Sequence, residues 1–139
     1  MKIFTDGGSR GNPGESAAGA VAYDDSDNLI WQQGQAIGVG TNNEAEYKAV
    51  LLALNWLETY LTDQQIKGEL LYFYLDSKLV VEQLSRRWKI KEERMRELAN
   101  ECWRLIAELR REVVFKHIPR EENGVADGLV NQALDEKMR

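Results

Sequence analysis

Cysteine and histidine are almost absent from this sequence of 139 residues, which contains one of each, Cys102 and His117. A lone cysteine cannot form a disulfide within the chain, so a small fold held together by disulfides is excluded. No apolar run approaches the roughly 18 residues that a transmembrane helix requires, and the N-terminal "MKIFTDGG" has no apolar signal core. We therefore expect a soluble cytoplasmic protein with no membrane partner.

Positive charge is also in short supply. The chain has 18 Lys and Arg against 23 Asp and Glu, which gives a net charge of −5 and an isoelectric point near 5.0. This balance argues against a protein that holds nucleic acid through bulk positive charge, so any such contact must be local. The length and the hydrophobic content of 43% fit one continuous core. We expect a single domain, residues 1–139, that acts as a monomer.

Apolar residues form five segments that we interpret as strands, namely residues 1–6, 17–25, 28–38, 69–76 and 112–118. The glycine-rich "GGSRGNPGES" after the first strand is expected to be a loop. Helical spacing predicts helices over residues 41–57, 77–85, the stretch from Met95 to Leu109, and 122–138. Strands separated by helices favour parallel pairing, whereas the first three can pair as an antiparallel meander. The sequence thus predicts an α/β fold with a five-stranded mixed sheet and helices on its faces.

Four carboxylates occupy unusual positions in this pattern. Asp6 and Asp76 each end a predicted strand. Each lies an even number of residues from aromatic residues of its own strand, so both side chains can project from matching faces of the sheet. Glu46 lies in the apolar arc of its predicted helix, and Asp127 belongs to an inward-facing stripe of the last helix. Because ligands bind beyond the carboxyl ends of the strands in such sheets, we expect the four acids to converge there.

Such a convergence is electrostatically unfavourable. Two ionised carboxylates about 5 Å apart repel by roughly 3 kcal/mol at an effective dielectric near 20. Divalent cations offset this repulsion, and oxygen ligands without a histidine or cysteine cluster favour Mg²⁺ or Mn²⁺. Two such ions about 4 Å apart can clamp the attacking and leaving oxygens of a phosphodiester. Each acid alone also has a structural interpretation, with Asp6 as a turn residue and Asp76 as a residue that helps to start a helix.

Four sequence blocks resemble those of the type 1 ribonuclease H family in order and spacing. They are "FTDGGSRGNPGESAAGAV", "TNNEAEYKAVLLAL", "YLDSKLVVEQL" and "HIPREENGVADGLVNQA", and together they span nearly the whole chain. The resemblance implies a ribonuclease H-like fold in which strands 1–3 are antiparallel and strands 1, 4 and 5 are parallel. It also implies cleavage of the RNA strand of an RNA/DNA hybrid duplex with two Mg²⁺ ions, leaving a 5′-phosphate and a 3′-hydroxyl.

The same resemblance implies roles for individual residues. Asp6 would bridge both metal ions, Glu46 and Asp76 would complete the metal site, and Asp127 would hold the ion beside the attacking water. Glu46 should also lie near a ribose 2′-hydroxyl, the group that distinguishes RNA from DNA. Substrate contacts are implied for Gly7, Gly8, Asn12, Thr41, Asn42, Asn43 and Ser77. Structural alternatives remain for several of them, with Asn12 as a turn former and Asn42 and Asn43 as polar residues beside a helix cap.

His117 precedes Asp127 by a spacing similar to that of the family's loop histidine, which implies help with proton transfer or product release. A structural role for a histidine at the end of a strand is the alternative. In the family that histidine stands on a flexible, glycine-containing loop, whereas here Pro119 follows it closely.

The basic segment "RRWKIK", residues 86–91, stands where many relatives carry a larger basic protrusion that grips the hybrid. Arg86, Arg87 and Trp88 could meet the DNA strand through phosphate contacts and stacking. The alternative is a solvated basic face that Trp88 anchors to the core. For the whole chain, the alternative to a nuclease is a non-catalytic nucleic-acid-binding domain on the same fold. That alternative predicts a missing carboxylate, and all four are present.

Overall fold

The computed structural model describes residues 1–65 and 70–137 and contains one mixed sheet with the strand order β3-β2-β1-β4-β5. β1 pairs antiparallel with β2 and β2 with β3, whereas β1 pairs parallel with β4 and β4 with β5. The predicted mixed sheet is therefore confirmed. The strands are β1 Lys2–Gly11, β2 Gly14–Tyr23, β3 Leu29–Gly40, β4 Leu71–Leu75 and β5 Val113–His117.

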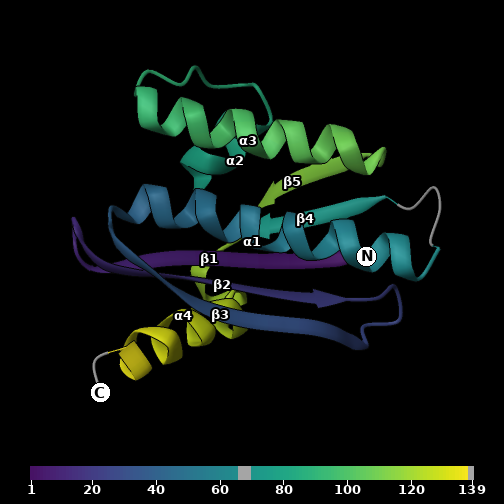
Figure 1. Ribbon diagram of the computed structural model, residues 1–139, viewed down its shortest axis with the longest axis horizontal. Helices are drawn as coiled ribbons and strands as arrows, with labels where there is room; N and C mark the ends of the chain where they lie inside the picture. Colours follow the sequence, from purple (N-terminus) through teal and green to yellow (C-terminus); the bar gives the residue numbers. More distant parts are fainter. Residues whose placement is uncertain (66–69, 138–139) are drawn as a thin grey trace.

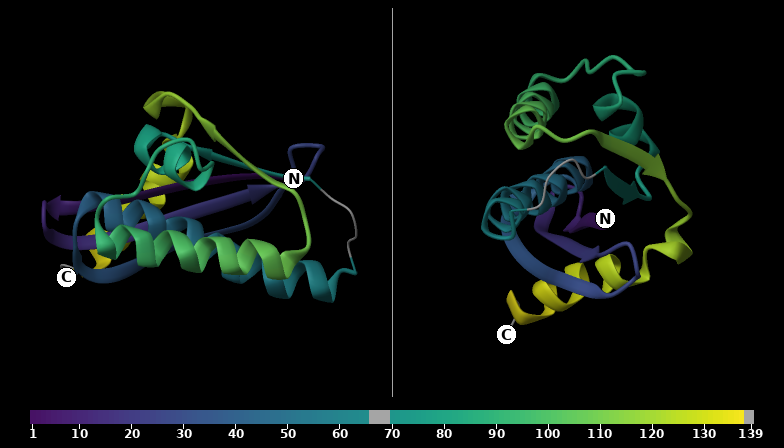
Figure 2. Two further views of the ribbon diagram at one scale, coloured as in Figure 1. Left: turned by 90° about the horizontal axis from the view of Figure 1, so that it is seen from above. Right: turned by 90° about the vertical axis from the view of Figure 1, so that its right-hand side faces the viewer.

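Helices cover both faces of this sheet, as the sequence predicts. α1 and α3 lie over one face, and α4 lies across the other beneath β2 and β3 (Figures 1 and 2). The helices are α1 Asn42–Asp63, α2 Lys78–Leu84, α3 Glu93–Leu109 and α4 Gly124–Lys137, with a 3-10 turn η1 at Arg120–Glu122. In the described part of the chain, no helix is long and apolar enough to span a bilayer.

The main core lies between α1, α3 and the sheet. Tyr47 and Leu54 of α1 and Phe73 of β4 have no exposed surface. The sequence predicts that β4 is buried on both faces, but its two tyrosines, Tyr72 and Tyr74, are half-buried. The physical reason is that α4 packs on β1, β2 and β3 and leaves the second face of β4 without a helix. There Tyr72 and Tyr74 contact each other, Phe4 and Lys116.

The glycine-rich segment is not a loop, which corrects the expectation from the sequence. β1 continues through it as far as Gly11, and its pairing with β2 extends to Gly11 and Gly14, so a tight turn at residues 12–13 closes a long hairpin. Asp6 therefore lies in the middle of β1 and not at its end. The parallel pairing with β4 stops at Thr5, so Asp6 still lies just beyond the end of the neighbouring strand.

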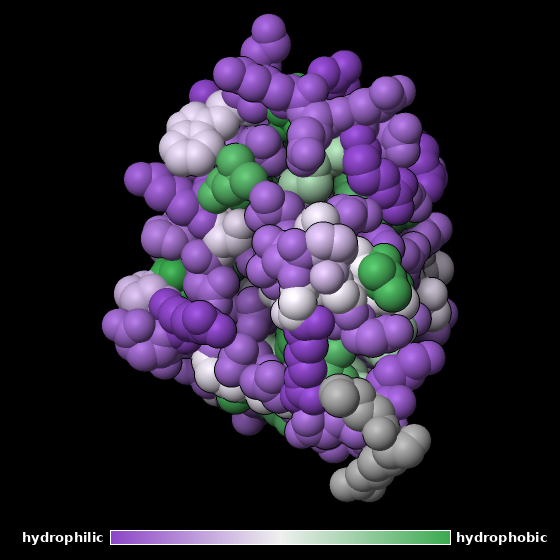
Figure 3. All heavy atoms as spheres, turned by 90° about the vertical axis from the view of Figure 1, so that its left-hand side faces the viewer, coloured by the Kyte–Doolittle hydropathy of each residue, from purple (hydrophilic) through white to green (hydrophobic). Residues whose placement is uncertain are grey.

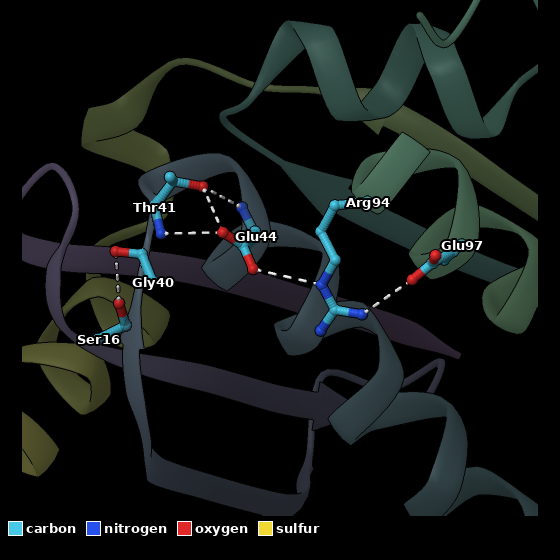
Figure 4. A network of polar contacts seen from close by, with 6 residues as sticks. All are labelled: Ser16, Gly40, Thr41, Glu44, Arg94 and Glu97. Atoms are coloured by element: carbon cyan, nitrogen blue, oxygen red, sulfur yellow. Dashed lines mark hydrogen bonds and ion pairs between the residues drawn. The ribbon is translucent and has the colours of Figure 1, made fainter. Parts of the chain in front are cut away.

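The helix starts predicted for α1 and α2 are confirmed. Thr41 Oγ1 accepts a hydrogen bond from the Glu44 amide at 3.1 Å, and Glu44 reaches back to Thr41, which completes a capping box (Figure 4). Ser77 caps α2 through the Val80 amide. Arg94 at the start of α3 also pairs with Glu44 at 3.4 Å (Figure 4).

Close packing of α1 on β1 depends on Gly7. A Cβ atom at this position would lie 2.2 Å from the carbonyl carbon and oxygen of Ala45 and 2.4 Å from the amide of Glu46. Backbone atoms of a buried helix cannot move aside cheaply, so no residue with a side chain fits. At Gly8 the same added atom would meet Val130 Cγ1 at 3.7 Å, an ordinary contact.

We expect Gly7→Ala to lower the free energy of unfolding by at least about 2 kcal/mol, because α1 must move away from β1. Gly8→Ala is the matched control, and its stability should stay within about 1 kcal/mol of the wild type. Urea unfolding followed by circular dichroism measures both. Equal stability of the two variants would show that the close contact at Gly7 does not constrain the helix.

Candidate active site

Three carboxylates from three different elements meet at one edge of the sheet. Ligand oxygens of Asp6 on β1, Glu46 on α1 and Asp76 just after β4 all lie within 4.8 Å of one another. The parallel register pairs Phe4 with Tyr74, and their rings stack at 4.9 Å, so the strands do project matching residues on the same face. The convergence expected for these three acids is therefore present in the structure.

Glu46 reaches this edge because α1 approaches β1 so closely. Its carboxylate accepts a hydrogen bond from the Gly7 amide, and its exposed fraction is 6%. The Gly7 amide thus holds a predicted metal ligand in place. The substrate contact implied for Gly7 stays a prediction.

Burial and mutual repulsion disturb the ionisation of these acids. The pKa of Asp6 is raised to about 7, mainly by burial and also by the charges of Asp76 and Asp127, although a hydrogen bond to Glu46 acts in the opposite direction. Burial also raises the pKa of Glu46 well above its usual range, and the charge of Asp6 adds to that increase. Without a cation, the site therefore retains protons near neutral pH.

The donor set fits a hard divalent cation. Carboxylate oxygens at this spacing are the ligands that Mg²⁺ and Mn²⁺ prefer, and a cation would replace the protons that the buried acids otherwise keep. Asp127 is not within the same 4.8 Å group, but it lines the same cavity and its charge reaches Asp6. Its Oδ2 accepts a hydrogen bond from Asn131 Nδ2 at 3.3 Å.

The acids line an open cavity of about 440 Å³. Of the residues with implied substrate contacts, those that line it are Gly7, Gly8, Asn42, Asn43 and Ser77. Sequence reasoning missed further lining residues, which are Ser9, Arg10, Arg120, Val130, Asn131 and Leu134. The surface that faces the viewer in Figure 3, on the left-hand side of Figure 1, is mostly hydrophilic with small separate apolar patches.

Asn12 and Asn42 brace the rim of this cavity. The Asn42 amide donates to Asn12 Oδ1 at 3.0 Å, and Asn42 Oδ1 accepts from the Ser9 amide at 2.9 Å. These bonds tie the β1–β2 hairpin to the first turn of α1. Asn12 and Thr41 do not belong to the described lining of the cavity. The bonds thus support structural roles for Asn12 in the turn and for Asn42 beside the helix cap. Asn42 also lines the cavity, so it can contact a substrate there.

His117 lies at the exposed end of β5 and is not among the described residues that line the acidic cavity. It lies close enough to Glu82 of α2 for their charges to interact. Arg120, three residues further along the chain, lines the cavity instead. β5 ends at His117, and Pro119 precedes the 3-10 turn η1, which leads into α4. Arg120 is the first residue of this turn, and the turn places it in the lining of the acidic cavity.

The basic segment forms a separate groove of about 650 Å³ beside α3, lined by Arg86, Arg87, Trp88 and their neighbours. Trp88 is 44% exposed, so it does not anchor the segment in the core, where Ile90 is buried instead. Arg87 makes a paired contact with Glu82, at 2.9 and 2.7 Å, and the Arg86 guanidinium stacks over Trp103 at 3.8 Å. Both arginines are therefore held in place by the protein itself.

The strand order and the acid cluster define a ribonuclease H-like α/β protein. A family model described as reverse transcriptase-like matches residues 4–133. LC11-RNase H1, which was isolated from compost and crystallised with an RNA/DNA hybrid, is 36% identical, with a TM-score of 0.94 over 99% of both chains. The chain therefore belongs to the type 1 ribonuclease H family of hydrolases.

Other relatives agree with this assignment. RNase H1 of the archaeon Halobacterium salinarum is 32% identical over 97% of both chains, with a TM-score of 0.88. A bifunctional protein of Mycobacterium tuberculosis is 38% identical over 135 residues, which are 96% of this chain but 35% of that relative. The chain thus spans about a third of the length of the mycobacterial relatives that it matches.

The raised pKa of Asp6 gives the metal-free protein a defined pH dependence. A carboxyl whose folded pKa lies above its unfolded value stabilises the fold at low pH, and that contribution is lost as the pH rises through the folded pKa. We expect the free energy of unfolding in EDTA to fall between about pH 4 and about pH 7, the window set by the Asp6 values of 3.8 and about 7.

Asp6→Asn should flatten this slope and leave the metal-free protein at least as stable as the wild type near neutral pH, because one buried like charge is removed. Urea unfolding at several pH values measures both proteins. A clear loss of stability in Asp6→Asn at neutral pH would identify Asp6 as a stabilising residue of the fold.

Proposed function

We propose that this chain is an endoribonuclease that hydrolyses the RNA strand of RNA/DNA hybrids with the help of two divalent metal ions. The observation that carries the proposal is the approach of Asp6, Glu46 and Asp76 within 4.8 Å at one sheet edge. Support comes from LC11-RNase H1, a relative of nearly the same length whose structure contains an RNA/DNA hybrid. All four acids come from this chain, so the proposed metal site requires no residue from a second subunit.

In the proposed reaction, a water oxygen forms a bond to phosphorus and the bond from phosphorus to the 3′-oxygen breaks. The water loses one proton as it attacks and the 3′-oxygen takes one up, which leaves a 3′-hydroxyl and a 5′-phosphate. Asp6, Glu46 and Asp76 would hold the ions, and Asp127, which lines the same cavity, would hold the ion beside the attacking water. Bound Mg²⁺, or Mn²⁺ in its place, supplies the positive charge that stabilises the phosphorane-like transition state and lowers the pKa of water.

The cavity offers distinct contacts for the substrate. Asn42, Asn43 and Ser77 provide polar groups at its wall, and Gly8 leaves the surface of β1 open. Glu46 is the acid proposed to lie near the ribose 2′-hydroxyl, which is the chemical difference between the RNA and DNA strands. Exposed Trp88, whose ring centroid lies 5.9 Å from Lys78 Nζ at the start of α2, is proposed to stack against the DNA strand.

Cleavage of end-labelled duplexes tests this function directly. With Mg²⁺ or Mn²⁺, the wild type should cut the RNA of RNA/DNA, leave DNA/DNA intact and lose activity in EDTA. Asp6→Asn should reduce cleavage by at least about 10³-fold, because the charge that balances the metal ions is lost. A non-catalytic binding domain would instead retain the hybrid in a mobility-shift assay without cutting it under any metal condition.

Because Arg120 lines the cavity, the cleavage rates of an Arg120 variant and a His117 variant can be compared. A guanidinium pairs well with phosphate oxygens, so Arg120→Ala should lower the rate of hybrid cleavage by about tenfold or more. A catalytic role for His117 stays a prediction, and because the imidazole lies outside the cavity lining, we expect His117→Ala to lower the rate less. Single-turnover cleavage rates of both variants measure the two losses. A larger loss of rate in His117→Ala than in Arg120→Ala would contradict this prediction.

A further inference from the structure

Asn123 is a polar residue that is almost completely buried, with an exposed fraction of 1%. It follows η1 and directly precedes α4, so it lies where the chain passes from β5 to the opposite face of the sheet. Its side-chain Nδ2 donates to the Thr5 carbonyl oxygen at 2.9 Å and, over a longer contact of 3.4 Å, to Asp76 Oδ2. One amide group therefore touches β1 and the residue after β4.

These contacts join the elements that carry the acids. Thr5 immediately precedes Asp6, and Asp76 is itself one of the three clustered carboxylates. The backbone oxygen of Asn123 also accepts a hydrogen bond from the Asp127 amide at 3.1 Å. Asn123 is thus connected, through side chain or backbone, to the positions of Asp6, Asp76 and Asp127.

The side chain is not fully satisfied, which argues against a purely stabilising role. Asn123 Oδ1 is buried and has no hydrogen-bond partner within the described structure. A buried polar atom without a partner destabilises a fold, so the advantage of asparagine here lies in its donor, Nδ2. That donor faces Asp76, which Asp6 and Glu46 repel because all three are acids at close range.

We propose that Asn123 is a positioning residue that holds the Asp76 carboxylate toward Asp6, and so sets the geometry of the metal site. This inference rests on the proposed function, because it concerns the residues that would bind the ions. Asn123 does not need to touch substrate or metal for this role. Partners of metal-binding carboxylates commonly change metal affinity by about 10- to 100-fold when they are removed.

Two substitutions separate the donor from the rest of the residue. Asn123→Ala removes the side chain and keeps the backbone contacts with Arg120 and Asp127. Asn123→Asp keeps the shape but replaces the donor by a carboxylate that repels Asp76. Asn55→Ala is the control, because Asn55 is an exposed residue of α1 whose amide bonds only to the Leu51 carbonyl oxygen of its own helix in the described structure.

The first measurement is Mn²⁺ binding to the protein without substrate, by calorimetry well below the unfolding temperature of each variant. We expect about tenfold weaker binding for Asn123→Ala, a larger loss for Asn123→Asp and no change for Asn55→Ala. In hybrid cleavage, kcat should fall with KM for the hybrid nearly unchanged. Unchanged Mn²⁺ affinity in both Asn123 variants, with only a lower unfolding temperature, would overturn the inference.

A crystal structure of the metal-free Asn123→Ala variant provides a test that does not depend on metal binding. We expect the Asp76 carboxylate to turn away from Asp6, whereas an unmoved carboxylate would overturn the positioning role. If the wild type neither binds Mn²⁺ nor cleaves the hybrid, the proposed function fails, and this comparison of Asp76 positions still decides whether Asn123 orients the acid.

Discussion

The contact between α1 and β1 at Gly7 is the constraint on which the rest of the structure depends. Because no Cβ separates the helix from the strand, the Gly7 amide reaches the Glu46 carboxylate, and the turns that follow deliver Tyr47 and Leu54 to the core. The same approach that packs the core therefore also places an acid beside Asp6. Folding and site assembly share one interface, so a change that loosens this packing affects both.

This arrangement forces like charges together in a place that water reaches poorly. Burial raises the pKa of Asp6 and of Glu46, and each further acid at the edge adds to the repulsion. Two of the acids are bonded to neighbours that have little freedom to move, the Gly7 amide for Glu46 and buried Asn123 for Asp76. Asp127 accepts its bond from the exposed Asn131. On the proposed function, a divalent cation bound by these acids would offset their mutual repulsion.

The sequence predicted the features that depend on local periodicity. The parity of Asp76 with Tyr74, and the position of Glu46 in the apolar arc of its helix, follow from the geometry of one strand and one helix. The hairpin that extends β1 through the glycines was missed, because glycines and serines carry no strand signal and the pairing with β2 decides. Asn123 was missed for a similar reason, since its partners, Thr5 and Asp76, are distant in sequence.

The distribution of positive charge constrains how the proposed substrate is held. The chain is acidic overall, and in its basic segment Arg87 is paired with Glu82 while Arg86 stacks on Trp103. At the acidic cavity, Arg10 is paired with Asp135, and Arg120 supplies further positive charge. A hybrid bound through few phosphate contacts releases few counterions, so its affinity depends only weakly on salt. On the proposed function, recognition then depends mainly on the fit of the ribose and the scissile phosphate at the carboxylates.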